Sequence, residues 1–371
     1  MKKKLVAVCS LAACSAATQA QSNVTVYGSL DQYLGYIRSS TGQHITALND
    51  GAILRSRLGF RGVEDLGNGY QAKFTLEQGI NADSGTAADS GRLFDRQAWV
   101  GVNTPVGEFR LGRQNSVPFF IGGAIDYTER TTFGSIINSF GVPSRYDNDI
   151  SYKSPRIADF QVDLHYALTE TAGQSTRGVT QLGVDYSSGP YRAGYAGLWA
   201  KPPASATFSD RVVYHNAYAD YDYGQGKVYL AYVRSNNVTG NANGNNAAAI
   251  LSNVSIPNNA FAGTNPNVQR MYNIYQVSAD YRVSAQLRVG ALYGVMKDSS
   301  GGDAGAQGGN VGAYYDLSKR TTLYGFANYM KNDTNAGFRF SGSAGPSGNL
   351  AGADINGKSL TGLQAGILHR F

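Results

Sequence analysis

Three arginines crowd a short stretch of the sequence that begins at position 54 and reads LRSRLGFRGVEDLGNGY. The basic residues Arg55, Arg57 and Arg61 occupy odd-numbered positions. The apolar residues Leu54, Leu58 and Phe60 occupy even-numbered positions. Successive side chains of a β-strand point to opposite faces, so a strand here would be apolar on one face and rich in guanidinium on the other. Guanidinium groups that line a water-filled space attract anions. The chemistry indicated is therefore steering of anions rather than bond making.

Motifs typical of enzymes and metal sites do not accompany these arginines. Neither G-x-S-x-G nor H-E-x-x-H occurs, so the usual signatures of serine hydrolases and zinc proteases are missing. The histidines are scattered without the spacing of metal ligands: His44, His165, His215 and His369. The segment 67–72, GNGYQA, fits a dinucleotide pattern but leads into a strand instead of a helix. We therefore expect that the protein is not an enzyme and that it binds no metal and no cofactor. The alternative that stays open is a hydrolase on an outer-membrane β-barrel, because such an enzyme can lack these motifs.

The first 20 residues have the features of a secretory signal peptide. A basic start (Lys2–Lys4) precedes the apolar core LVAVCSLAAC and the small-residue cleavage site TQA. Cleavage after Ala20 removes three lysines and lowers the net charge from +6 to +3, which makes nucleic acid a poor candidate partner. Both cysteines leave as well, so the mature chain has no disulfide framework. Residues 11–14 also fit a lipobox, and a lipidated Cys14 is the alternative.

The composition of the chain favours strands over helices. Its 371 residues include 46 Gly and 25 Tyr but only 16% charged residues. Gly weakens helices and Tyr favours half-buried pleated surfaces. Beyond residue 20 no run of 18 apolar residues occurs, so no transmembrane helix is expected.

A single unit repeats along the rest of the chain: an alternating segment of about ten residues, a tight turn, a second such segment and a long polar loop. The tight turns are expected at 66–69, 104–107, 154–159, 187–190, 223–226, 281–285 and 316–320. The long loops are expected at 39–51, 81–92, 115–148, 168–178, 201–210, 236–267, 298–309 and 332–360. This rhythm predicts an all-β fold, an antiparallel transmembrane barrel of about 16 strands that occupies 21–371. Its turns would be periplasmic, its long loops extracellular, and both termini would lie at the turn side.

Alternation within the segments and the chain end support a barrel over a soluble sandwich. Phe160, Val162 and Leu164 alternate with Gln161 and Asp163, and similar alternation recurs around 227–235 and 285–295. Tyr recurs near segment ends, as in the aromatic girdles of membrane barrels. In lipid every backbone group must be paired, so the sheet must close. A barrel of this size holds water, and the polar parity of each strand would face that water.

Several segments resemble a known family. They are QSNVTVYGSLD, RSRLGFRGVEDLGNGYQAKFTLEQG, LFDRQAWVGV, GEFRLGRQ, RYDNDISYKSP and the terminal HRF. In this order they resemble the Gram-negative general porins of the beta-proteobacterial and neisserial type, from Gln21 to Phe371. The resemblance implies a homotrimer of 16-stranded barrels in the cell outer membrane, with the third long loop folded into each lumen. It also implies contact with outer-membrane lipid and lipopolysaccharide, and a C-terminal aromatic, Phe371, that serves as a signal to the barrel-assembly machinery.

The same resemblance places three arginines at the pore constriction: Arg57, Arg96 and Arg145. Counting residues from the tight turns tests two of them. At about 3.3 Å per residue and a tilt near 40°, Arg57 and Arg96 both lie about 20 Å above the turn side. Glu77 reaches a similar height, whereas Arg61 and Arg113 come out lower and Arg55 higher. In the alternative interpretation, these arginines only hold strands together through pairs with Glu64, Asp65, Glu77 or Asp95.

The third long loop is more apolar than the others, which predicts that it packs against the inner wall and narrows the pore. Its apolar residues are Phe119, Phe120, Ile121, Ile125, Phe133, Ile136, Ile137 and Phe140. Its central acids, Asp126 and Glu129, would oppose the wall arginines and create a transverse field, or else cap a short helix or lie in solvent. We expect Trp99 to face lipid or the trimer interface.

The predicted function is passive diffusion of small hydrophilic solutes and ions through a water-filled, mildly anion-favouring channel. A substrate-specific outer-membrane channel, or an adhesin that uses its long loops, is the alternative. The segment 236–267 is rich in Asn, Ala and Gly. This composition is typical of a disordered surface loop rather than of a packed recognition surface.

Overall fold

The computed structural model describes residues 23–121, 125–129, 131, 133–170, 172–173, 178–201, 211–236, 271–340 and 348–371. The expected signal peptide, Cys14 and nearly all of 236–267 lie outside the described residues. Helices are few and short: α2 (Val117–Phe120), α3 (Ile136–Phe140) and η3 (Gly352–Asp354). None of the helices in these ranges is both long enough and apolar enough to cross a membrane.

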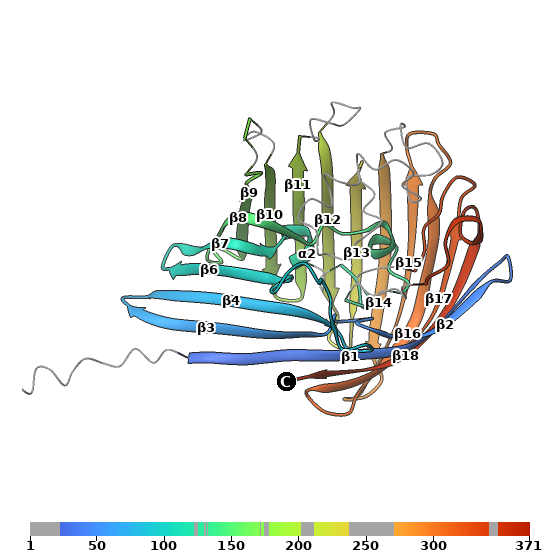
Figure 1. Cartoon of the computed structure of the whole chain (residues 1–371), viewed down its shortest axis with the longest axis horizontal. Helices are drawn as coiled ribbons and strands as arrows, with labels where there is room; N and C mark the ends of the chain where they lie inside the picture. The colour runs from blue at the N-terminus through green and yellow to red at the C-terminus, as the bar shows by residue number, and fades with distance from the viewer. Residues whose placement is uncertain are drawn as a thin grey trace, which may run out of the picture.

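Antiparallel strands make up nearly all of the remaining structure (Figure 1). Their bounds are β1 (Asn23–Ser39), β2 (His44–Asp50), β3 (Arg57–Gly67), β4 (Tyr70–Asn81), β5 (Thr86–Ala87), β6 (Gln97–Thr104), β7 (Gly107–Asn115), β8 (Arg145–Lys153), β9 (Phe160–Ala167), β10 (Val179–Ser188), β11 (Tyr191–Ala200), β12 (Val212–Asp222), β13 (Lys227–Ser235), β14 (Tyr272–Arg282), β15 (Leu287–Asp298), β16 (Ala306–Asp316), β17 (Thr321–Asn332) and β18 (Ser359–Arg370).

The 18 labelled strands form a closed barrel of 16 crossings. β2 and β3 pair with one edge of β1, β2 with its upper half and β3 with its lower half, so together they make a single crossing. β5 is a two-residue pairing with β4 inside the second loop. β1 also pairs with β18, which closes the sheet. The predicted barrel, its tight turns and the side on which both ends of the barrel lie are confirmed.

The second crossing is interrupted at residues 51–56, a feature that the sequence pattern did not predict. The buried carboxylate of Asp31 accepts hydrogen bonds from the backbone N–H groups of Ile53 and Leu54, both at 2.8 Å, and from the Tyr324 hydroxyl at 2.5 Å. The Asp31 N–H donates to Ser56 Oγ at 2.9 Å. Leu54 packs against buried apolar side chains, so its predicted lipid-facing position is wrong. The strand begins at Arg57.

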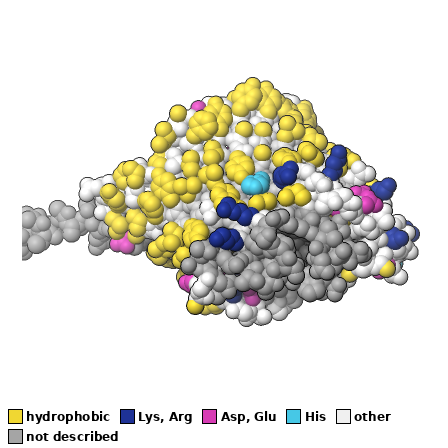
Figure 2. Space-filling model, turned by 90° about the horizontal axis from the view of Figure 1, so that it is seen from above, with side chains coloured by type: hydrophobic (Ala, Val, Ile, Leu, Met, Phe, Trp, Pro, Cys, Tyr) yellow, Lys and Arg dark blue, Asp and Glu magenta, His cyan; other side chains and the backbone are white. Residues whose placement is uncertain are grey.

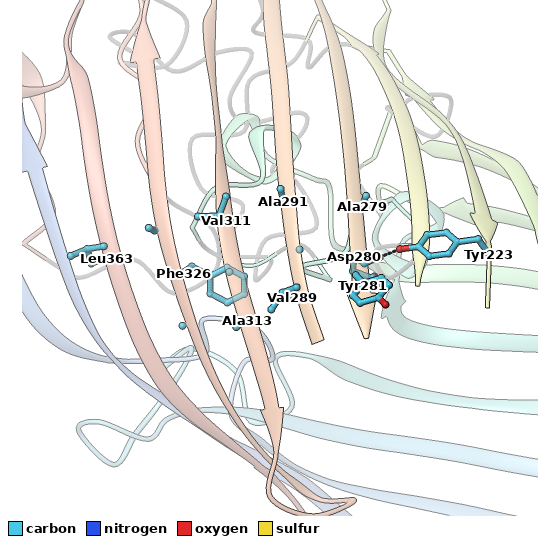
Figure 3. A pocket seen from close by; sticks show the side chains of 14 residues that line it. Tyr223, Ala279, Asp280, Tyr281, Val289, Ala291, Val311, Ala313, Phe326 and Leu363 are labelled. Carbon is cyan, nitrogen blue, oxygen red and sulfur yellow. Dashed lines mark hydrogen bonds between the residues drawn. The ribbon is translucent and has the colours of Figure 1, made fainter. Parts of the chain in front are cut away.

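The outward faces of the strands are apolar, as the alternation predicts. Exposed outward residues include Leu30, Leu34, Val100, Leu111 and Leu164. Figure 2 shows this surface as a broad hydrophobic area with basic side chains and a histidine along its margin. Small residues on β14 to β17 leave a shallow hollow in it, seen in Figure 3 between Ala279, Ala291, Val311 and Ala313. This surface is the one that faces lipid.

Candidate pore constriction

Two of the predicted arginines meet around one carboxylate on the inner wall. Glu77 of β4 lies beside Gly59 of β3 and Gln97 of β6 in the sheet register. Its Oε1 is 2.7 Å from Arg96 Nε and 3.6 Å from the Arg57 guanidinium, and its Oε2 accepts from Tyr27 at 2.9 Å. Glu77 is thus the counter-ion of both arginines. Of the two guanidinium side chains, Arg57 is the more accessible, at 16% exposure against 5% for Arg96.

Arg55 and Arg145 flank this pair. Arg55 lies in the interruption before β3, 3.8 Å from Asp50, with a hydrogen bond to Asn81. Arg145 begins β8 and is 1% exposed, with its guanidinium 4.7 Å from the centre of the Phe119 ring. Phe119 belongs to the third loop, so Arg145 lies between that loop and the wall. Three of these guanidinium groups, Arg57, Arg96 and Arg145, gather around the single carboxylate of Glu77, which leaves an excess of positive charge there. Arg55 instead lies near acidic neighbours that include Asp50 and Asp95.

Arg113 lies at a break in the alternating pattern of β7 and is buried. It pairs with Ala98, and its neighbours Leu111 and Phe109 on the same parity are exposed to the outside. A register shift between Gly112 and Gln114 marks a bulge at this point. The Arg113 side chain binds the Asp95 carbonyl at 2.5 Å and Asp147 at 2.7 Å. Its assignment to the constriction stays a prediction, because the bulge breaks the strand parity on which that assignment depended.

Arg61 and Trp99 also have defined places. Arg61 lies lower on β3, over the Tyr27 ring at 5.3 Å, in keeping with its predicted height. Trp99 pairs with Thr75 on the lumen side, donates to Gln97 and lies 4.2 Å from the Arg110 guanidinium. The expectation that Trp99 faces lipid or another subunit is wrong.

The third loop, residues 116–144, crosses the lumen and is pinned to the wall at separate points. The Val117 N–H donates to Gln181 of β10 at 2.9 Å, and the Tyr127 N–H to Ser278 of β14 at 3.2 Å. Gln364 of β18 donates to the Thr131 hydroxyl at 3.2 Å. Burial raises the pKa of Tyr127 well above its usual range, so its phenol stays neutral and donates to Asn310. The predicted folding of this loop into the lumen is what the structure shows.

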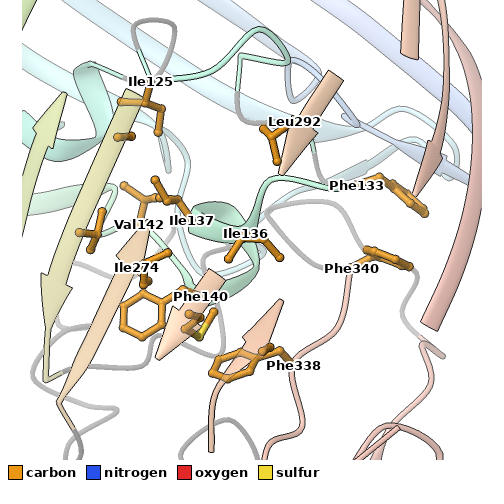
Figure 4. Packing of buried hydrophobic residues seen from close by; sticks show 14 of the residues in the cluster. Ile125, Phe133, Ile136, Ile137, Phe140, Val142, Ile274, Leu292, Phe338 and Phe340 are labelled. Carbon is orange, nitrogen blue, oxygen red and sulfur yellow. The ribbon is translucent and has the colours of Figure 1, made fainter. Parts of the chain in front are cut away.

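Most of the apolar residues of the loop pack against the inner wall and against the last loop (Figure 4). Phe120 is the exception: it is exposed, so its predicted burial is wrong. Phe133 stacks on Phe340 with ring centres 5.6 Å apart, and Phe140 lies 6.5 Å from Phe338. Both partners come from the segment 333–340, which follows β17. The sequence pattern missed this contribution of the last loop, although a Phe-x-Phe pair in a polar loop was an available signal.

The two central acids of the loop differ in position. Asp126 is fully buried, and its carboxylate accepts hydrogen bonds from Thr128 N–H at 2.9 Å, Ser135 Oγ at 3.0 Å and Gln276 Nε2 at 3.0 Å. It fastens the loop to β14, so its predicted place opposite the arginines on the pore surface is wrong. Glu129 is half exposed and lies 4.0 Å from Arg288 of β15.

A hollow of about 690 Å³ opens between the loop and the periplasmic turns. Glu129 and Ile53 lie at its inner end, and Gly224, Ser284 and Ser318 at the turns. Its lining has five bases and four acids: Lys227, Arg282, Arg288, Lys319 and Arg370, with Glu129, Asp222, Asp280 and Asp316. This mixed lining offers water and small ions a polar route below the constriction.

The sequence matches the family of Gram-negative porins over residues 7–335. The chain belongs to this family. An outer membrane porin protein of Bordetella pertussis is 29% identical, with all of both chains covered. The major outer membrane protein P.IB of Neisseria gonorrhoeae is 27% identical over 89% of this chain and 94% of the relative.

Among solved structures, an anion-selective porin from Comamonas acidovorans superposes with a TM-score of 0.75 at 25% identity. The match covers 95% of this chain and all of that porin. The chain is accordingly an outer-membrane porin, a water-filled channel for passive diffusion of small hydrophilic solutes and ions. Its relatives are channels rather than enzymes.

Proposed function

We propose that this porin favours anions over cations and that the group Arg55, Arg57, Arg96 and Arg145 sets the preference. The carrying observation is the excess of guanidinium around Glu77, with Arg57 the most accessible of the four side chains. An ion that crosses a narrow polar passage responds to the local charge more than to the net charge of the protein. The anion-selective porin of Comamonas acidovorans, a structural relative, supports the same sign of selectivity.

The reversal potential in a KCl gradient tests this proposal, with Arg57→Glu as the variant. A change of two charges about 8 Å from the ion path raises the energy of an anion and lowers that of a cation by about 1 kcal/mol each in water, which is about a thirtyfold fall in the anion-to-cation permeability ratio. Arg61→Glu is the matched control, because Arg61 lies lower on the same strand face; we expect a smaller shift. An unchanged reversal potential in Arg57→Glu would show that this side chain does not act at the constriction.

We also propose a cleaved leader that ends at Ala20, a homotrimeric assembly, association with lipopolysaccharide, and recognition of Phe371 by the barrel-assembly machinery. The position of Phe371 supports its recognition by the assembly machinery: its ring lies against Gly28, where β1 and β18 meet to close the barrel. For assembly, a solved Vibrio cholerae OmpT structure is described as a trimer form, at 16% identity. Stepwise openings in threes in a planar bilayer, together with the N-terminal sequence of the mature protein, test the trimer and the leader.

A substrate-specific channel is the second candidate, favoured by one observation in the lumen. Phe120 of α2 is 56% exposed, with Lys153 Nζ 4.4 Å from its ring centre, and both line a small pocket with Arg110 and His165. An exposed ring beside cations suits an anion with an apolar body. Conductance that saturates with benzoate but rises linearly with acetate would favour this candidate; linear behaviour with both would favour the general pore.

A further inference from the structure

His165 of β9 lies on the lumen side of the wall, between two carboxylates. Its Nδ1 is 2.7 Å from Asp149 Oδ2 of β8, and its Nε2 is 3.0 Å from Asp163 Oδ1 of β9. A neutral imidazole has a single N–H, so one of its nitrogens would turn a lone pair toward a carboxylate oxygen, whereas an imidazolium donates from both nitrogens. The geometry therefore indicates that these three side chains, which we call the histidine cluster, hold one extra proton.

The burial of Asp149 supports the same conclusion. Its side chain is fully buried, and within the described residues its Oδ1 has no hydrogen-bond partner, while its Oδ2 meets His165. An ionised carboxylate away from water is costly unless a cation or a proton lies beside it. His165, itself 8% exposed, supplies that charge.

The histidine cluster lies in the wall on the periplasmic side of the arginines. His165 and Arg110 pair with Ser151 from opposite sides, so they belong to one row of the sheet. Lys73 continues this row on the other side of β6. Glu77 lies two inward positions above Lys73 on the same strand. The row therefore faces the lumen just below the constriction.

The charges of this part of the wall balance one another apart from the proton of the cluster. Below Glu77, the inward faces of β4 and β6 to β9 carry three bases and three acids: Lys73, Arg110 and Lys153 with Glu108, Asp149 and Asp163. One proton on His165 thus decides whether this wall is neutral or carries one positive charge. An ion in a narrow polar passage responds to such local charge.

The other charged side chains that face the cluster are two bases. Lys153 of β8 lies opposite Asp163 in the sheet register, and Arg110 of β7 lines the same small pocket as His165. The buried phenol of Tyr146 on β8 also interacts with Asp149. On the remaining sides, β10 places Gln181 opposite His165, and α2 has no titratable side chain. The two carboxylates are therefore the groups that retain the proton on the ring.

We propose that His165 is a specificity-determining residue of the pore, an imidazolium that prevents Asp149 and Asp163 from opposing anions below the constriction. The inference rests on the proposed anion preference, to which it adds a charge that a count of Arg and Lys misses. A histidine with a structural role alone would need its shape and its hydrogen bonds, but not its charge.

The reversal potential in a KCl gradient at neutral pH, in a bilayer of zwitterionic lipid, tests the charge. His165→Gln removes it, and we expect about a fivefold fall in the anion-to-cation permeability ratio, from one charge about 8 Å from the ion path. His165→Lys keeps the charge and should keep the ratio of the parent. His165→Gln combined with Asp163→Asn loses one charge of each sign and should restore that ratio. His215→Gln is the matched control, because His215 lies on the outward face of β12, and we expect no change.

A pH scan of the same measurement separates charge from shape. From about pH 6.5 to about pH 9.5, an imidazolium can lose its proton while most Lys and Arg side chains keep theirs. The anion-to-cation ratio of the parent should therefore fall as the pH rises, toward the ratio of His165→Gln. The ratios of His165→Gln and His165→Lys should stay nearly level.

Three results would overturn the inference: an unchanged ratio in His165→Gln, a parent whose pH profile is as level as that of His165→Gln, and equal losses in His165→Gln and His165→Lys. The last result would leave His165 a structural role only. A parent that favours cations would contradict the proposed function, whereas a further shift toward cations in His165→Gln would still support this inference. Single-channel conductance shows whether each variant is folded; if His165→Gln is not, the pH profile of the parent decides.

Discussion

At the scale of single residues, the arginines that look equivalent in the sequence have different surroundings. Arg57 and Arg96 share Glu77, Arg55 is held by Asp50 and Asn81, and Arg113 binds Asp147 and the Asp95 carbonyl at a bulge in β7. The sequence analysis gave ion pairing that holds strands together as an alternative to a pore role for the arginines. Such ion pairing is present at Glu77. Pairing and a pore role are compatible, because one carboxylate cannot neutralise two guanidinium groups.

Glu77→Gln is expected to raise anion preference and lower stability at the same time. The substitution leaves Arg57 and Arg96 near the lumen without their shared counter-ion, and removal of one partner from a buried pair costs about 3–5 kcal/mol. The reversal potential should move further toward the anion side, and the temperature at which the folded band disappears on a gel should fall. Glu108→Gln is the control: Glu108 pairs with the more exposed Lys73 and Arg110, so its loss should cost less.

Outward and inward faces were predictable from the sequence because a two-residue period carries through any unbroken strand. The prediction failed where the period breaks. Leu54, in the interruption at 51–56, packs against buried apolar side chains instead of facing lipid. The prediction for Trp99 failed for another reason. A large apolar side chain suggested a lipid-facing position, but a lumen that is crossed by a loop also contains buried apolar space. Asp126 was misplaced because nothing in the sequence shows the partners that a loop residue finds across the barrel.

At the scale of elements, the third loop is fixed by hydrogen bonds to wall residues more than by its own short helices. Gln276 of β14 makes more than one hydrogen bond to this loop. Its side chain donates to Asp126 and accepts from the Ile137 N–H at 3.2 Å.

Gln276→Leu should loosen this loop while the barrel stays closed. Three hydrogen bonds to the loop are lost, one of them to a carboxylate, at about 1.5–3 kcal/mol for the charged one. We expect larger current noise and more frequent partial closures in single-channel records. Val277→Ala, the next position but on the outer face, should leave the noise unchanged. A quiet Gln276→Leu channel would show that the apolar contacts alone hold the loop.

The interruption at 51–56 depends on a single buried carboxylate. Asp31→Ala would leave the Ile53 and Leu54 N–H groups and the Tyr324 hydroxyl without their acceptor, at about 1–3 kcal/mol for each group that water does not reach. The expected result is a lower unfolding temperature and a changed conductance, since the Ala52 carbonyl of this segment accepts from Thr131 of the third loop at 3.0 Å. Gln32→Ala, the outward neighbour, is the control. Equal unfolding temperatures for Asp31→Ala and the parent would contradict this role.

At the scale of the whole molecule, stability requires that the first and last strands meet, because an open edge in lipid leaves backbone groups unpaired. β1 and β18 pair from Ser29 with Arg370 to Ser39 with Leu360. The terminal residue completes the seam: Phe371 and Gly28 exchange backbone hydrogen bonds in both directions, each at 3.1 Å. Closure therefore runs to the last residue of the chain.

The seam predicts a contrast between two glycines on outward strand faces. A Cβ at Gly28 would lie 2.5 Å from both the Arg57 carbonyl oxygen and the Phe371 ring, whereas one at Gly325 would meet only the Gln364 carbonyl at 3.5 Å. Gly28→Ala must therefore displace the terminal ring or part β1 from β3, and we expect less folded protein and a lower unfolding temperature. Gly325→Ala should fold like the parent. Refolding into detergent, followed by gel mobility with and without heating, measures both; equal yields would mean that the ring moves aside at no cost and that closure does not depend on this contact.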